Sequence, residues 1–128
     1  MYLEKEEYRA IATQMLTNIS GDMFQHPRYH SNWGILLIHQ IINPVEFVIT
    51  GPTAEERRKE LEQHYLPMLI IAGSIRESSL PLLRNRHNSK KTWLYVCQNN
   101  RCKLPVETIE EALSLFPNNY RGNSQIPL

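Results

Sequence analysis

The stretch VEFVITGPT, residues 45–53, decides the fold that the rest of the sequence must fit. Its first five residues are rich in β-branched and aromatic side chains, which is typical of a strand, and Thr50-Gly51-Pro52 closes the run with turn residues. Thr53, with Glu56 three positions later, matches a helix N-terminal capping box. The stretch therefore predicts a strand that turns directly into a helix.

A second apolar run, MLIIA at 68–72, lies just beyond the predicted helix over 53–65 and ends at Gly73. A continuous apolar run of this kind is typical of a central strand that is buried on both faces. Strand, helix and strand in this order predict a βαβ unit, whose crossover should be right-handed.

The C-terminal half of the chain adds a hairpin and a helix. Residues 92–97 and 102–105 read as two strands around the turn Gln98–Arg101, where Asn residues tolerate positive φ. A short helix over 79–83 precedes them. A second capping-box pattern, Thr108 with Glu111, opens a predicted helix over 108–116.

The first 42 residues have helical periodicity. One helix is predicted over 2–19, with Gly21 as a left-handed C-terminal cap, and a second over 27–42, with Pro27 in its first turn. Apolar side chains share one face of the first helix and cover most of the circumference of the second, so the second helix needs partners on more than one side. These side chains are Tyr8, Ile11, Met15, Leu16 and Ile19, then Tyr29, Trp33, Leu36, Leu37 and Ile41, widened by Ile35, Ile38 and Ile42.

The predicted fold is α/β: two N-terminal helices, then a small β-α-β-(α)-β-β-α unit with a mixed sheet of about four strands. We divide it into a helical hairpin over 1–43, an α/β domain over 44–117 and a loose tail over 118–128. A helical hairpin cannot enclose a core alone, so it should dock on the α/β domain or on something outside this chain.

Composition excludes several functions. The 128 residues carry a net charge of +1, which gives no field favouring nucleic acid or an anionic membrane. No apolar run approaches the roughly 20 residues of a membrane span, and the charged start lacks a signal-peptide core. Two cysteines do not make a secreted disulfide framework. We therefore expect a cytoplasmic protein without a membrane or nucleic-acid partner.

Cys97 and Cys102 lie at the two ends of the predicted hairpin turn and so face each other on neighbouring strands. Opposite Cβ atoms are about 4.5–5.5 Å apart in general, and a disulfide needs roughly 3.8 Å. The pair can be reduced structural thiols, a cross-strand disulfide or a redox centre. A zinc site needs about four ligands, and only His87 lies nearby in sequence. We expect no bound metal and no cofactor.

Two further places are candidate ligand sites. His26 and His30 flank a helix start, where they can act as a base or ligand or can simply cap and pack. Thr50, Gly51 and Thr53 lie between a strand and a helix, the place where a phosphate binds in many α/β folds. This turn has one glycine and lacks the Gly-rich phosphate-binding pattern, so it can equally be a tight connection.

The remaining charged residues favour surface and packing roles. The basic cluster holds Arg84, Arg86, His87, Lys90 and Lys91. It is followed by Trp93 and Tyr95, which alternate on a strand and are better explained by packing than by binding of nucleic acid. Pairs of glutamates sit on predicted solvated helix faces, and no Ser-His-Asp pattern is present.

The hairpin sequence YVCQNNRCKLPV, residues 95–106, resembles the C-terminal signature of the thioredoxin-domain-containing family typified by bacterial YyaL, which has a spermatogenesis-associated relative in animals. HPRY at 26–29, the strand over 45–51 and HYLP at 64–67 are similar as well, so the likeness covers residues 2–116. The family often has Thr-Asp-Pro after the Pro-Val, where this chain has Glu107-Thr108-Ile109.

The resemblance implies a thioredoxin-like domain and a six-hairpin helical toroid, of the glycosidase type, upstream of the region matched here. Residues 2–42 would then be the final helices of the toroid, and no catalytic residue of the family falls on this chain. We therefore expect a non-catalytic structural or interaction domain, which forms a homodimer through residues 2–42 because its apolar helix faces lack cover. The alternatives are thiol-redox activity at Cys97 and Cys102 and binding of a sugar or nucleotide phosphate.

Overall fold

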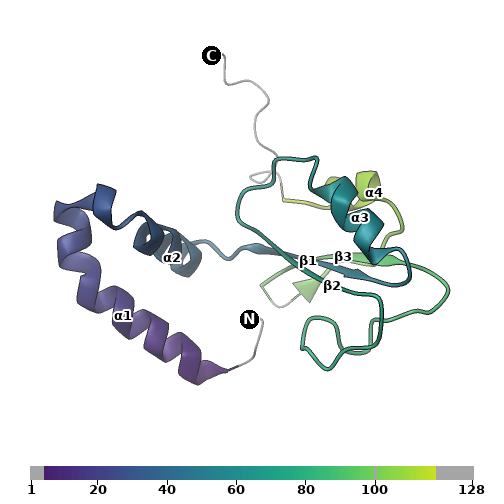
Figure 1. Cartoon of the computed structure of the whole chain (residues 1–128), viewed down its shortest axis with the longest axis horizontal. Helices are drawn as coiled ribbons and strands as arrows, with labels where there is room; N and C mark the ends of the chain where they lie inside the picture. Colours follow the sequence, from purple (N-terminus) through teal and green to yellow (C-terminus); the bar gives the residue numbers. More distant parts are fainter. Residues whose placement is uncertain (1–4, 100, 118–128) are drawn as a thin grey trace, which may run out of the picture. The chain divides into compact units, whose positions relative to one another are not determined.

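The computed structural model describes residues 5–99 and 101–117, and it divides the chain between Asn43 and Pro44 into two compact units, a helical unit and an α/β unit. The predicted fold class is confirmed: two helices precede an α/β unit with a mixed four-stranded sheet (Figure 1). Within the described residues, no helix is both long and apolar enough to cross a membrane. The tail over 118–128 lies outside the described residues.

The first helix is longer at its C-terminal end than predicted. Helix α1 spans Glu6–Gln25, so Gly21 lies inside it and the predicted cap at Gly21 is wrong. The physical reason is Met23, which is buried together with Leu16, two helical turns earlier. The apolar stripe therefore continues past Gly21 and keeps the chain helical.

The second predicted helix is divided. Pro27–Tyr29 form a 3₁₀ turn, η1, and helix α2 spans Ser31–Ile41. His30 separates them, because its backbone leaves the helical region at φ −122° and ψ 27°. The His30 ring nitrogen Nε2 lies 2.5 Å from Oδ2 of Asp22 in α1, so the corner is fixed by a side-chain contact.

The helical unit has very little interior. Helices α1 and α2 meet beside η1 and diverge from there (Figure 1). Leu16 and Met23 are buried in α1, and α2 buries no residue completely. Two helices that diverge cannot cover each other's apolar faces over their whole length.

The sheet has the strand order β2-β1-β3-β4. Strand β1 (Val45–Thr50) pairs in parallel with β2 (Leu69–Ser74) and antiparallel with β3 (Trp93–Gln98). The two-residue strand β4 (Arg101–Cys102) pairs antiparallel with β3. We expected residues 68–72 to form the central strand, and this is wrong. Strand β2 is a half-exposed edge, whereas every residue of β1 is buried.

Helices α3 (Ala54–Leu61) and α4 (Ile109–Ser114) cover one face of the sheet (Figure 1). The ring of Phe47 on β1 stacks on that of Phe116, with centroids 5.9 Å apart. This main core consists of Val45, Phe47, Ile49, Ala54, Leu61, Leu94, Val96, Ile109, Ala112 and Phe116. Phe47, Ile49, Leu94 and Val96 alternate along their strands, which is why they point to one face.

The opposite face is covered by the irregular segment over 75–92. A smaller cluster of Val48, Leu83 and Cys97 is buried there. The short helix predicted over 79–83 is instead a hydrogen-bonded turn, in which the amides of Leu83 and Arg84 both donate to the Leu80 carbonyl. Asn85, at φ 60°, directs the chain out of the turn before a helix can propagate.

The two capping-box patterns have different outcomes. Thr108 and Glu111 form the predicted box, with reciprocal side-chain to backbone hydrogen bonds at the start of α4. Thr53 makes no side-chain cap to α3, so the box predicted with Glu56 is wrong. The Thr53 hydroxyl instead lies 2.7 Å from the Thr92 hydroxyl, which ties the start of α3 to the residue before β3.

Candidate functional site

The free end of the β3–β4 hairpin carries the candidate site. Cys97 and Cys102 lie directly opposite each other in the strand register, with Cα atoms 3.9 Å apart, and a disulfide joins their sulfurs. Asn99, at φ 54°, makes the positive-φ turn that the sequence predicts at this place. Of the alternatives left open by the sequence, the structure contains the cross-strand disulfide.

The two sulfurs have different surroundings. The Cys97 residue is 1% exposed and packs against Val48 and Leu83 beneath the irregular segment. Cys102 is exposed, because it belongs to the short edge strand β4. A reagent from solution can therefore reach the Cys102 sulfur more readily than the Cys97 sulfur.

The guanidinium of Arg86 contacts both sulfurs. Nη2 lies 3.2 Å from Sγ of Cys102, and Nη1 lies 3.6 Å from Sγ of Cys97. Two further contacts hold Arg86 in place: its guanidinium carbon is 5.0 Å from the centroid of the Tyr95 ring, and its carbonyl accepts a 2.8 Å hydrogen bond from the buried Thr50 hydroxyl. A cation held beside sulfur stabilises the thiolate over the thiol.

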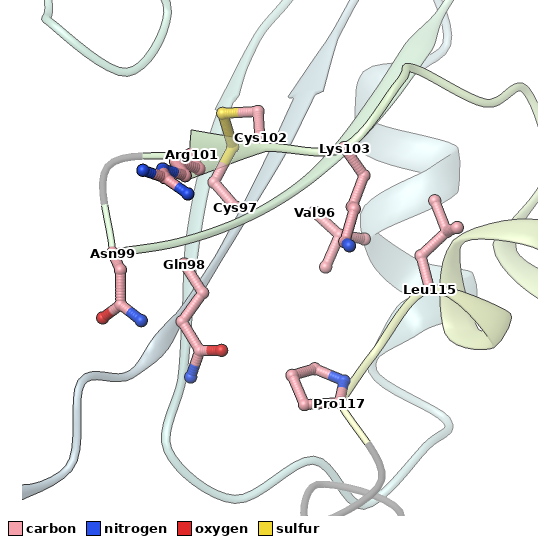
Figure 2. Close-up of a pocket in the computed structure, with 9 residues that line it drawn as sticks. All are labelled: Val96, Cys97, Gln98, Asn99, Arg101, Cys102, Lys103, Leu115 and Pro117. Carbon is pink, nitrogen blue, oxygen red and sulfur yellow. A yellow bond between two sulfur atoms is a disulfide. The ribbon is translucent and has the colours of Figure 1, made fainter.

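A cavity of about 550 Å³ lies beside the same hairpin, within the size range of small-molecule sites. It is lined in part by Val96, Gln98, Lys103, Leu115 and Pro117 (Figure 2). Val96 packs into the main core, whereas the next residue, Cys97, packs into the smaller cluster. Cys97 and Cys102 also line the cavity, and in Figure 2 their disulfide lies at the end away from Leu115 and Pro117.

The described lining of this cavity contains the disulfide, amides, aliphatic groups and the side chains of Arg101 and Lys103, without a carboxylate or an imidazole. It does not bring together the groups of an acid–base site. Elsewhere in the described part of the chain, no three His, Cys, Asp or Glu residues lie close enough to hold a metal ion.

The predicted anion site at Thr50, Gly51 and Thr53 is filled by internal hydrogen bonds. The Gly51 amide donates to the Ser74 carbonyl, the Thr53 amide to the Thr92 hydroxyl and the Ala54 amide to the Gly51 carbonyl. Pro52 has no amide hydrogen. The turn is a tight connection whose donors are already satisfied by protein groups.

The two histidines belong to the corner of the helical unit. His30 contacts Asp22, as described above, and the exposed His26 ring lies 6.5 Å from the centroid of Tyr29. Thr50, Gly51 and Thr53 belong to the other unit. His26 and His30 occupy N-cap positions without a side-chain capping hydrogen bond, and their side-chain contacts are those of packing residues.

Arg86 is the residue of the candidate site that the sequence alone does not point out. It appears there as one of the five residues of the basic cluster. No spacing distinguishes Arg86 from Arg84 or Lys90, because the irregular segment has no periodicity from which its contacts could be predicted. Lys91, another member of the cluster, lies over the Trp93 ring and pairs with Glu107 at 2.5 Å.

The perturbed carboxyl groups lie away from the disulfide. Hydrogen bonds from Arg58 lower the pKa of Glu55 on α3, and the capping contacts with Thr108 lower the pKa of Glu111 on α4. Both are exposed surface residues with structural partners. Their pKa shifts therefore describe helix stabilisation rather than a catalytic centre.

Comparison of the chain with protein-family models, with curated proteins and with solved structures finds no match.

Proposed function

We propose that this chain is a non-catalytic interaction module, in which the helical unit docks on a matching apolar surface and the α/β unit is carried beside it. For the chain as given, we assign that surface to the helical unit of a second copy. The observation that carries the proposal is the exposure of large apolar side chains along both helices, within a stretch from 10 to 45 that holds two formal charges.

The exposed apolar side chains run through both helices and the turn between them. Phe24, at 75%, Tyr29, at 73%, and Ile41, at 72%, are the most exposed. The others are Tyr8, Ile11, Met15, Ile35, Ile38 and Ile42. Large contiguous apolar patches of this kind mark interaction sites in folded proteins.

Formal charge is sparse in these helices beyond Glu6, Glu7 and Arg9 at the start of α1. Between Arg9 and Glu46, Asp22 and Arg28 are the residues with a formal charge. A helix that faces water usually carries charged side chains on its outer face, and depletion of charge is typical of the centre of an interface. Docking of these helices therefore removes few charged groups from water.

The helical unit of a second copy offers an apolar surface that can cover these exposed side chains. In a twofold dimer the same patch lies on both partners, so an apolar patch covers an apolar patch. The two formal charges have opposite sign and Asp22 already contacts His30, so little like-charge repulsion opposes pairing.

We extend the proposal to the family that the hairpin resembles. In a YyaL-like protein the helices over 2–42 would close a helical toroid, which also requires an apolar and uncharged docking face. The order of two helices followed by an α/β unit supports this assignment. A cytoplasmic location forms part of the same proposal.

Light scattering at tens of micromolar chain tests the dimer. We expect a mass twice the chain mass of 15.0 kDa for the wild type and one chain mass for Ile11→Glu and Ile38→Glu. Leu104→Glu is the matched control, because Leu104 is 86% exposed but belongs to the α/β unit. A wild-type monomer, or a dimer that only Leu104→Glu dissociates, contradicts the proposal.

A further inference from the structure

We propose that the Cys97–Cys102 disulfide is a thiol-exchange centre, in which Cys102 is attacked by an aliphatic thiolate and Arg86 stabilises the thiolate that leaves. This inference concerns the α/β unit alone and does not depend on how the helices dock. It rests on the unequal exposure of the two sulfurs and on the arginine that contacts both.

Exposure selects the sulfur that is attacked. Cys102 lies on the two-residue edge strand β4 and is exposed, whereas Cys97 is covered by Leu83 and Val48. An incoming thiolate therefore forms its bond with Sγ of Cys102. The bond between the two protein sulfurs breaks at the same time, and its electron pair goes to Sγ of Cys97.

Arg86 lies where the departing charge develops. With the disulfide intact, its Nη1 is 3.6 Å from Sγ of Cys97 and its Nη2 is 3.2 Å from Sγ of Cys102. A leaving thiol with a lower pKa departs faster, so a cation at this distance favours exchange. The contacts of Arg86 with Tyr95 and Thr50 do not involve the disulfide, so they persist after the disulfide opens.

A second thiolate completes the reaction. It attacks the sulfur of the first reductant in the mixed disulfide at Cys102, which forms an oxidised disulfide of the reductant and leaves Cys102 as a thiolate. Two reductant thiolates have then lost two electrons in total, and the protein disulfide has gained them. A disulfide oxidant of the same class reverses both steps.

Other titratable groups lie around Cys97 and Cys102, and together with Arg86 they determine whether the thiolate form is favoured. On β1, the buried Glu46 is opposite Cys97 in the strand register, so its carboxylate opposes formation of a second negative charge. On the irregular segment His87 follows Arg86, and on the hairpin Tyr95 and Arg101 flank the cysteines. Arg86 contacts both sulfurs directly, so we expect the thiolate form to be favoured.

The fold allows the Cys97–Cys102 disulfide to open and close. Strand β4 contributes no residue to the main core, and Arg101 and Cys102 are both exposed. The Lys103 amide still donates to the Val96 carbonyl beyond the disulfide, which keeps the hairpin strands paired. Opening the bond therefore leaves the sheet and its two helices in place.

Exchange with glutathione as the probe tests the proposal on the full chain. We expect wild-type protein to pass through a mixed disulfide that peptide mass analysis places on Cys102. Arg86→Gln should slow the exchange about threefold, because a loss of about one pKa unit of thiolate stabilisation is expressed only in part in the transition state. Arg86→Lys should recover part of the rate, and Arg84→Gln, which removes a nearby exposed cation, should leave it unchanged.

A second measurement uses wild-type protein only, so it stands if Arg86→Gln does not fold. Thiolate absorbance of the reduced chain as a function of pH should give a midpoint below that of an ordinary cysteine. A midpoint at or above the ordinary value overturns the proposal. Equal exchange rates for folded Arg86→Gln and Arg84→Gln, or a mixed disulfide on Cys97 alone, overturn it as well. A dithiol protein used in place of glutathione distinguishes a protein reductant from a small thiol.

Discussion

The α/β unit of this chain buries most of its apolar strand side chains, whereas the helical unit leaves many of its apolar side chains exposed. In the α/β unit every residue of the central strand β1 is buried, and two helices cover one face of the sheet. In the helical unit Leu16 and Met23 are the described residues that are fully buried. The difference indicates that the α/β unit is stabilised by its own core, and it supports our proposal that the helical unit docks on a partner surface.

The largest expected difference in stability is between alanine substitutions of two phenylalanines, one in each unit. Phe47→Ala opens a cavity in the main core and should lower the free energy of unfolding by about 3–5 kcal/mol. Phe24→Ala removes a side chain that is 75% exposed, so the α/β unit should lose less than about 0.5 kcal/mol. Urea unfolding followed by Trp93 fluorescence, in a Trp33→Phe background, measures both. Equal losses would contradict the comparison.

Alanine substitutions of two glycines, one in each unit, test the same difference in packing. A Cβ atom added at Gly51 would lie 2.4 Å from the Lys91 carbonyl oxygen, and its φ is 134°. Gly51→Ala should therefore destabilise the α/β unit by more than about 1 kcal/mol.

Gly21→Ala, inside α1, meets no atom within 4 Å and should stabilise its helix by roughly 0.5–1 kcal/mol. Thermal unfolding by circular dichroism measures both glycine variants. A stabilised Gly51→Ala variant would show that the turn can relax.

Substitutions in the two Thr-x-x-Glu motifs should differ less in their effect on the free energy of unfolding. Thr108→Ala removes the side-chain cap of α4 and should cost about 1 kcal/mol. Glu56→Ala removes no capping contact, since Thr53 makes no capping box with it, and should change stability by less than about 0.5 kcal/mol. Denaturant midpoints at constant slope compare the two variants, and equal shifts would contradict the assignment of a single capping box.

The smallest expected effect is a dependence on pH. Hydrogen bonding with the Thr108 side chain, and then with the amides of Thr108 and Glu107, lowers the pKa of the Glu111 carboxyl. A carboxyl whose pKa is lower in the folded chain contributes stability above its unfolded-state pKa. That contribution is lost as the pH falls through the folded-state value. Glu111→Gln should therefore flatten the acid limb of the stability profile, and an unchanged acid limb would contradict this.

The sequence predicts the element types well, because periodicity and turn residues report local structure. The strand over 45–49, the turn at Asn99 and the capping box at Thr108 are all observed. Strand order is harder to predict, since a continuous apolar run does not show whether neighbours lie on one side or on two. Residues 68–72 were therefore expected to be central, whereas the strand observed there, β2 at Leu69–Ser74, lies at the edge of the sheet.

The candidate site was predictable only in part. Spacing across the hairpin turn places Cys97 opposite Cys102, because antiparallel register is a local property. The contact with Arg86 depends on the path of an irregular segment across the sheet, which no periodicity encodes. Likewise, the hydroxyl pair of Thr53 and Thr92 joins residues far apart in the chain, and it replaced the predicted local cap.

Hydrogen–deuterium exchange at two chain concentrations tests the central claim most directly. The account predicts that amides of α1 and α2 become more protected as the concentration rises, while amides of β1, β3 and α4 stay equally protected. Concentration-independent protection of α1 and α2, as strong as that of β1, would show that the helical unit is already covered within one chain and would contradict the account.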